Sequence, residues 1–192
     1  MTRRRKWLLI LALGLCAIVG LGGTWLWYLG KYVHQHCIMS AGLAFRVYSS
    51  NHQGRLPFST NGFGDALLIL AREDPSSIHC LCGPGDDGQI FAAALTNNSH
   101  LPEVHCSRVY VQGLSETNDP TICILFDRNS CRGGDHFRSP WGHRVREVIF
   151  LDGSMKVISD ENWSEFSLKQ VELLKTAGFS HTEALRLFPA VQ

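Results

Sequence analysis

The N-terminal part of the chain carries a long apolar run. Residues 7–29 contain no charged side chain, and as a helix rising 1.5 Å per residue they would measure about 35 Å, enough to cross a bilayer. Helical spacing continues over residues 31–51, where Leu43 and Val47 lie four positions apart and Phe45 occupies a neighbouring row. The pattern predicts a transmembrane helix that runs on into the rest of the protein.

Turn residues divide the segments that follow. Gly54 comes just past the end of the predicted helix and Pro57 prevents it from resuming. A second helix is predicted over residues 63–73. From residue 78 to about 158, clusters of Gly, Pro, Asn and Asp separate short segments, which is typical of strands. The best strand candidates are residues 108–112, 121–126, 147–151 and 154–158, with Asp152 and Gly153 as the turn of a hairpin between the last two.

The C-terminal residues return to helical spacing. A helix is predicted over residues 167–177 with Gly178 past its end, and Ser180 with Glu183 has the spacing of a capping box that opens a last turn. The predicted fold is α+β, with a long N-terminal transmembrane helix continuing into a small antiparallel-sheet domain and a helical C-terminal tail. The predicted organisation is a basic segment at 1–6, a transmembrane helix at 7–29, an extracytoplasmic domain at 30–160 and a tail at 161–192.

Charges beside the apolar run predict its orientation. Arg3, Arg4, Arg5 and Lys6 precede the run and a single Lys31 follows it closely, so the positive-inside rule places the N-terminus in the cytoplasm and the body of the chain outside. A cleaved signal peptide begins in the same way, but this run is long for one and no small-x-small cleavage site follows. The sequence predicts an uncleaved signal anchor in the cell membrane, with the lipid bilayer as a partner.

Composition narrows the classes of function. The chain has 192 residues, 18% of them charged, and a formal net charge of +1. No cluster of Lys and Arg lies beyond the first six residues, so there is no electrostatic footprint for DNA or RNA. Nucleic-acid binding is not expected, and no small-molecule substrate is evident.

Six cysteines follow the apolar run, and they are disulfide candidates: Cys37, Cys80, Cys82, Cys106, Cys123 and Cys131. An even number outside the cytoplasm favours disulfides, although the pairing does not follow from the sequence. The alternative is that several are buried thiols, which pack as small apolar side chains.

Two groups of residues offer possible ligands for a metal ion. His79, Cys80, Cys82, His105 and Cys106 form the densest group of possible zinc ligands, but their spacing does not match the usual pairs. Calcium is the other candidate, with oxygen ligands from one loop at Asp127, Asn129 and Asp135. That loop lacks the regular alternation and closing Glu of a dedicated calcium loop, so a polar turn is favoured and no cofactor is predicted.

Catalysis is not expected. His143 and Asp152 invite an acid–base interpretation, but Asp152 is better placed to accept a hydrogen bond within its own turn. The sequence also lacks the Gly-x-Ser-x-Gly, His-Glu-x-x-His and glycine-rich phosphate-binding motifs. The protein is predicted not to be an enzyme.

Several segments together resemble type IV pilin-like proteins, in particular a pseudopilin-like family with a His-spacer-Asp-Gly motif. Residues 37–48 and the exit N-H-Q-G-R-L-P at 51–57 resemble that family's helix, and residues 79–84 occupy the place of its Cys-Pro segment. S-R-V-Y-V-Q-G-L at 107–114 resembles one of its strands, and H-R-V-R-E-V-I-F-L-D-G at 143–153 resembles its closing hairpin. The motif residues are Gly54, Pro57, His143, Asp152 and Gly153.

The resemblance implies a pilin-like architecture more strongly than a secretion role. Pilins carry a Gly cut by prepilin peptidase and a Glu five residues into the mature helix, and neither is present here, since no acidic residue precedes Asp65. The expected function is that of a membrane-anchored, pilin-like envelope protein with a structural or protein-interaction role, linked to type II secretion only if it is processed. Its envelope partner is unknown. The alternative is an extracytoplasmic metal-binding or redox domain that uses Cys and His.

Overall fold

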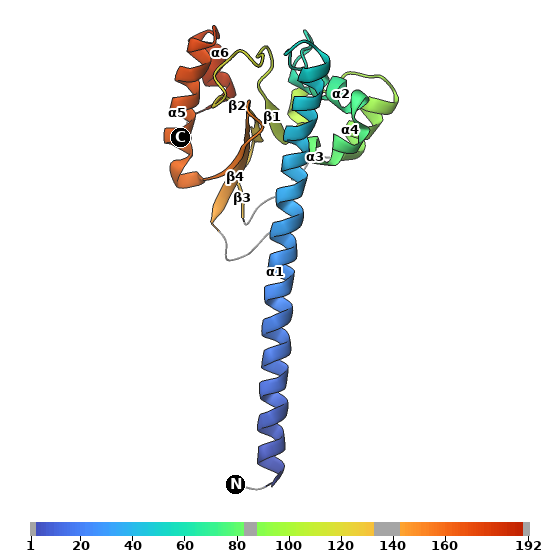
Figure 1. Cartoon of the computed structure of the whole chain (residues 1–192), viewed down its shortest axis with the longest axis vertical. Helices are drawn as coiled ribbons and strands as arrows, with labels where there is room; N and C mark the ends of the chain where they lie inside the picture. The colour runs from blue at the N-terminus through green and yellow to red at the C-terminus, as the bar shows by residue number, and fades with distance from the viewer. Residues whose placement is uncertain (1–2, 83–87, 133–142, 190–192) are drawn as a thin grey trace.

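One long helix carries the N-terminal part of the chain and ends inside a head of mixed helices and strands (Figure 1). The computed structural model describes residues 3–82, 88–132 and 143–189, except for the side chains of residues 3–13, 26–37, 79, 82, 131 and 132. Helix α1 spans Arg3–Asn51. Ala41, Phe45 and Tyr48 recur at helical spacing and are buried in the head.

Of the rows at helical spacing on α1, the one that contains Ala41, Phe45 and Tyr48 is buried. Ala41, Phe45 and Tyr48 turn inward, whereas Leu43 and Val47 are 62% and 50% exposed. The four-residue spacing of Leu43 and Val47 marks one row of the helix surface, and the spacing alone does not say which row faces the core.

The transmembrane prediction is contradicted. Among the described residues, no helix combines the length and the apolar character needed to cross a membrane. This finding overturns the predicted transmembrane helix at 7–29, the signal anchor and the single-pass membrane location with an extracytoplasmic domain.

Four short helices follow α1 on one side of the head: α2 (Phe63–Glu73), η1 (Pro75–Ser77), α3 (Ile78–Cys82) and α4 (Gly88–Thr96). The predicted bounds of α2 are confirmed. The strand-like pattern predicted from residue 78 is wrong for α3 and α4. Ala92, Ala93 and Ala94 lie within α4 and favour a helix, while Phe91 and Ala94 turn one face of it inward.

Five strands form one antiparallel sheet: β1 (Arg108–Tyr110), β2 (Cys123–Asp127), β3 (Cys131–Arg132), β4 (Arg144–Phe150) and β5 (Met155–Ser159). A short 3₁₀ turn, η2 (Glu103–His105), precedes β1. Strand β4 is central, because β2 and β3 both pair with its one edge and β5 pairs with its other. The predicted α+β class and the hairpin between the last two strands are confirmed.

Helices cover both faces of the sheet (Figure 1). Helix α1 packs on one face, where Phe45 stacks on Tyr110 with ring centroids 5.0 Å apart. Helices α5 (Asp160–Thr176) and α6 (His181–Leu187) lie on the other side of the sheet. There Phe126 of β2 stacks on Phe188 at 4.5 Å. The apolar tail therefore docks on its own domain.

Candidate functional site

The motif residues at the exit of α1 hold the chain in a tight turn. Gly54 has a φ of +79°, which favours glycine, and its N–H donates to the carbonyl of Ser49 at 2.9 Å. The carbonyl of Pro57 accepts a 2.8 Å hydrogen bond from the buried hydroxyl of Tyr110. Gly54 and Pro57 thus fasten the end of α1 to the sheet.

The motif residues of the hairpin turn are also architectural. Asp152 accepts a 2.8 Å hydrogen bond from the N–H of Ser154, as predicted for a tight turn. Gly153 has a φ of +79°, and its carbonyl lies 3.2 Å from the position that a Cβ on Gly42 of α1 would occupy. The turn of the β4–β5 hairpin therefore rests directly on α1, at a point where α1 has no side chain.

His143 does not join this turn. It is exposed and directly precedes β4, whereas Asp152 follows the other end of the strand. A strand of seven residues separates them by more than about 20 Å. His143 and Asp152 therefore form no acid–base pair.

The calcium candidates that the structure describes differ in their surroundings. Asp127 is fully buried, and its two oxygens accept hydrogen bonds from Arg108 Nε at 3.1 Å and from the N–H of Glu147 at 2.9 Å. Asn129 is exposed, and Asp135 lies outside the described residues. Over the described parts of the chain, no three His, Cys, Asp or Glu side chains gather as a metal site would require.

Three of the six disulfide candidates have described side chains. Cys80, Cys106 and Cys123 are all buried. Cys123 is a free thiol in β2, and burial raises its pKa well above the ordinary value. A thiol of this kind is not a reactive nucleophile. The side chains of Cys37, Cys82 and Cys131 lie outside the described residues, as do those of His79 and Cys82 in the zinc group, so the disulfide pairing stays a prediction.

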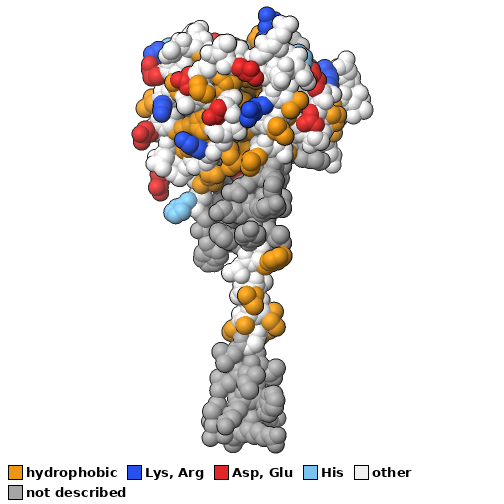
Figure 2. Space-filling model, viewed as in Figure 1, with side chains coloured by type: hydrophobic (Ala, Val, Ile, Leu, Met, Phe, Trp, Pro, Cys, Tyr) orange, Lys and Arg blue, Asp and Glu red, His pale blue; other side chains and the backbone are white. Residues whose placement is uncertain are grey.

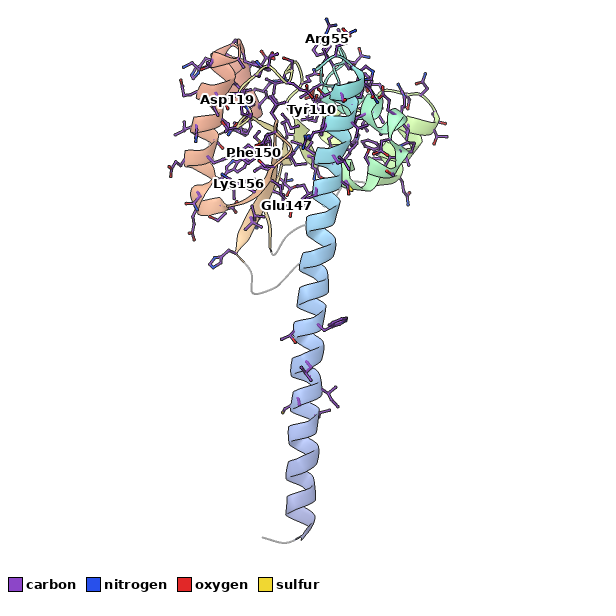
Figure 3. The ribbon with its side chains drawn as sticks, in the orientation of Figure 1. Arg55, Tyr110, Asp119, Glu147, Phe150 and Lys156 are labelled. Carbon is purple, nitrogen blue, oxygen red and sulfur yellow. The ribbon has the colours of Figure 1, made fainter. Side chains whose placement is uncertain are left out.

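Sequence reasoning missed a buried ionic cluster beneath α1 and α3. Arg108 Nε lies 3.1 Å from Asp127 Oδ1, and Arg108 Nη2 lies 3.6 Å from Glu147 Oε2. Arg108 also donates to the backbone carbonyl of Cys80. All three charged side chains are 0–1% exposed. Figure 3 places Glu147 on the side of the sheet nearest α1. The cluster joins β1, β2, β4 and α3, and its role is structural.

A cavity of about 370 Å³ opens between the sheet and the two C-terminal helices, and we call it the arginine cavity. Part of its wall is aromatic, formed by Phe63 of α2, Phe126 of β2 and Trp163 of α5. Among the described residues, its charged lining consists of Arg128, Arg146 and Arg186 and a single acid, Glu103. Positive charge therefore exceeds negative charge in its lining.

Arg128 and Glu103 are held in place by the backbone. Arg128 donates from Nε to the carbonyl of Cys106 at 3.0 Å and from Nη2 to the carbonyl of Glu103 at 2.8 Å. Its guanidinium lies 5.9 Å from the ring centroid of Phe63. The Glu103 carboxylate accepts a 3.0 Å hydrogen bond from the N–H of Phe63. Carbonyl groups fix the position of Arg128 but do not neutralise it.

Arg146 is buried more deeply than Arg128 and Arg186. Its side chain is 12% exposed, its Nη1 lies 2.9 Å from Asp160 Oδ1, and its guanidinium lies 4.4 Å from the ring centroid of Trp163. Its Nε is buried with no hydrogen-bond partner among the described residues. Asp160 also faces Arg144 at 3.3 Å, so one carboxylate serves two cations. Burial lowers the pKa of Arg146, because it removes water from around the guanidinium.

Arg186 completes the charged lining. It projects from α6, is exposed, and makes no hydrogen bond or ion pair with any residue that the structure describes. Ser180 fixes the start of α6 by accepting a 3.2 Å hydrogen bond from the N–H of Glu183, which confirms the predicted cap. Arg186 is therefore a cation available to a ligand.

No family model, curated protein or solved structure matches this chain. The assignment of function therefore depends on the geometry of the sites.

A second cavity, of about 280 Å³, lies over α2 and is polar. In it His100 Nδ1 lies 2.9 Å from Asp65 Oδ1, and the same oxygen accepts a 2.7 Å hydrogen bond from the N–H of Leu101. Asp65 Oδ2 accepts from Asn61. These contacts tie the loop after α4 to the first turn of α2. The role of Asp65 is therefore structural, because its hydrogen bonds explain why these polar groups gather around it.

Sequence reasoning did not find the arginine cavity, because its residues are distributed over the chain. Arg128 follows β2, Arg146 lies in β4 and Arg186 lies in α6. The one local signal was a charged residue within an otherwise apolar stretch, Leu185-Arg186-Leu187-Phe188. A cation between docked apolar residues indicates a place where the docked surface meets solvent or a ligand.

Proposed function

We propose that this chain is a pilin-like protein with a structural or protein-interaction role, and that its head binds another protein at the arginine cavity. The observation that carries the proposal is the excess of positive charge over an aromatic wall. Arg186 lacks a partner among the described residues, and Arg146 shares its carboxylate with Arg144. Binding sites commonly combine an apolar wall with a few placed polar groups.

The pilin-like part of the proposal is supported by the contact between α1 and the hairpin. In the family that the sequence resembles, a long helix lies against a small sheet. Here Gly42 of α1 and Gly153 of the hairpin turn allow such an approach, and Gly54 ends the helix beside the sheet. The residues of the resembling motifs thus serve this packing.

Binding is favoured over catalysis by the lining of the arginine cavity. The lining contains arginines, aromatic and aliphatic residues and Glu103, whose carboxylate is already hydrogen-bonded to the backbone of Phe63. Described residues supply no Ser, Cys or His to this lining as a nucleophile or base. The redox alternative is weakened at Cys123, where burial raises the pKa of the thiol.

The test is a pull-down that compares full-length chains carrying Arg186→Glu or Arg72→Glu. Both substitutions reverse one exposed arginine on a helix, but Arg186 lines the arginine cavity and Arg72 lies on α2 beside the polar cavity. We expect a partner retained by the unmodified chain to be lost with Arg186→Glu and retained with Arg72→Glu. Equal retention by both variants would contradict the proposal.

A further inference from the structure

We infer that His52 links the end of α1 to the end of α2 in a pH-dependent way, through a contact with Glu73 that forms when the ring is protonated and is lost when the ring is neutral. His52 directly follows α1, and Glu73 is the last residue of α2. This link does not involve the arginine cavity and does not depend on the proposed function.

Both ring nitrogens of His52 face oxygen atoms. Nδ1 lies 2.8 Å from the carbonyl oxygen of Tyr48, and Nε2 lies 3.1 Å from Glu73 Oε1. A carbonyl and an ionised carboxylate only accept hydrogen bonds, whereas a neutral imidazole has a single N–H to donate. With Glu73 ionised, both contacts therefore hold together only when His52 is an imidazolium.

The surroundings of the ring favour a cation. Tyr48 stacks on His52, with ring centroids 3.9 Å apart and an angle of 6° between the planes, and an aromatic face attracts positive charge. The C-terminal ends of α1 and α2 carry partial negative charge, which also favours a cation. Glu73 adds a full negative charge at the end of α2, where an acid is unfavourable unless a cation compensates it.

Other charged side chains in this region do not replace this pair. They are Arg55, Arg72, Asp74 and Glu116. Arg72 lines the polar cavity, and the carboxylate of Asp74 accepts from the N–H and the hydroxyl of Ser76. Among the described residues, Glu73 is the only acid within ion-pair distance of His52.

A neutral ring keeps only one of its two contacts. The carbonyl of Tyr48 is one of the last four of α1, which have no partner within the helix. The side chain of Glu73 is 39% exposed, so water can solvate its carboxylate. The remaining proton therefore stays on Nδ1, and the lone pair of Nε2 then faces the carboxylate. The stabilisation from Glu73 is present at acidic pH and is lost as the pH rises through the range in which histidine titrates.

His100 provides a matched comparison. Its Nδ1 lies 2.9 Å from Asp65 Oδ1, and its Nε2 has no partner among the described residues. A neutral ring with its proton on Nδ1 satisfies this contact. The pair of His100 and Asp65 therefore does not need an imidazolium.

The experiment uses double-mutant cycles of chemical denaturation on the full-length chain. One cycle combines His52→Ala with Glu73→Ala, and the other combines His100→Ala with Asp65→Ala. Each is measured at a pH of about 5.5 and of about 8.5, on either side of the ordinary histidine pKa of about 6.5. At the lower pH we expect His52 and Glu73 to be coupled by about twofold to fivefold in the equilibrium constant for unfolding, as in partly exposed ion pairs. At the higher pH this coupling should be lost, whereas that of His100 with Asp65 should remain.

NMR of the ring nitrogens is a second measurement, which needs no variant. We expect neutral His52 to carry its proton on Nδ1. A coupling of His52 with Glu73 that is equal at the two pH values, or absent at both, would overturn the inference, and so would a neutral His52 with its proton on Nε2. Loss of the coupling between His100 and Asp65 at the higher pH would show a general effect of pH and would also overturn it.

Discussion

Arg108 compensates two carboxylates in a part of the head with almost no solvent. Asp127 and Glu147 lie 3.1 Å and 3.6 Å from its guanidinium, and the three side chains are 0–1% exposed. Buried ions are tolerated only when they are paired and hydrogen-bonded, because the desolvation of each is unfavourable. Removing the cation would leave two acids close together in a poorly solvated environment.

Arg108→Met should therefore destabilise the head strongly. Methionine keeps much of the aliphatic stem of arginine but not its charge, and breaking a buried ion pair costs about 3–5 kcal/mol. Chemical denaturation of the full-length chain measures the change in the free energy of unfolding. Arg72→Met, at an exposed position on α2, is the control and should change it by less than about 0.5 kcal/mol.

Asp65 makes the stability of the head depend on pH in the acidic range. Burial alone would raise the pKa of this carboxyl, but hydrogen bonds from the N–H of Leu101, from His100 and from Asn61 together lower it. A lowered pKa in the folded state means that the ionised form stabilises the fold. That contribution is present above the unfolded pKa of about 3.9 and is lost as the pH falls through the folded value.

Asp65→Asn should flatten this part of the pH profile. We expect the variant to be less stable than the unmodified chain at pH 7 and the difference to shrink as the pH falls below about 4. His100→Gln should keep much of the acid dependence, because the hydrogen bond from Leu101 remains. Thermal unfolding between pH 3 and 7 provides the measurement, and an unchanged difference across that range would refute the assignment.

At the scale of elements, the position of α1 depends on its close approach to the β4–β5 turn. A Cβ on Gly42 would lie 3.2 Å from the carbonyl oxygen of Gly153 and 3.5 Å from Cγ2 of Ile149. These distances leave room for little more than a methyl group. Gly20, in the same helix, has nothing within 4 Å of a Cβ placed on it.

Gly42→Leu should force α1 away from the hairpin and destabilise the head by about 1–3 kcal/mol, as overpacking generally does. Gly20→Leu introduces the same residue into the same helix and should leave the unfolding of the head unchanged. Denaturation followed by the near-ultraviolet signal of the head aromatics compares the two. Similar effects of both substitutions would mean that α1 does not depend on this contact.

Helix α6 presents Arg186 to the arginine cavity, and Ser180 holds its first turn. Ser180→Ala removes the hydrogen bond to the N–H of Glu183 and should cost about 1 kcal/mol. Because α6 is short, we also expect faster amide exchange over residues 181–187. Ser154→Ala, in which the N–H that bonds Asp152 is kept, is the control and should not affect that exchange.

The sequence predicted elements best where one local pattern decides them. The bounds of α2, the turn at Asp152 and Gly153 and the cap at Ser180 all follow from short-range spacing or turn chemistry. Helix α5 begins at Asp160, earlier than the predicted residue 167. The prediction missed this part of the helix because its first residues are mostly polar, although Trp163 among them is buried. Helices α3 and α4 were missed because turn clusters beside them resemble those of strands.

At the scale of the whole molecule, the exposure of apolar side chains differs between the head and the part of α1 outside it (Figure 2). Leu15, Ile18 and Trp25 of α1 are 64–70% exposed, whereas the head mixes charged and apolar side chains on its surface. In Figure 3, Tyr110 lies between α1 and the sheet, and Phe150 lies on the side of α5. The sheet thus joins the helix α1 to the C-terminal helices that shape the arginine cavity.

The candidate site could not be predicted from the sequence, since it exists only after the chain folds. Arg128, Arg146 and Arg186 come from three separate parts of the chain, and none belongs to a spaced motif. The predicted motif residues Gly54, Pro57, Asp152 and Gly153 proved to be packing positions. Local patterns therefore indicated the framework of the head, and long-range assembly determined its charged cavity.

We propose that the head binds a partner protein at the arginine cavity. Hydrogen exchange of the full-length chain, measured with and without the partner retained in the pull-down, tests this proposal. We predict slower exchange over residues 103–109 and 181–189, which border the cavity, and unchanged exchange over residues 97–101 beside the polar cavity. Slower exchange confined to α2, α4 or α1, with residues 181–189 unaffected, would contradict the account.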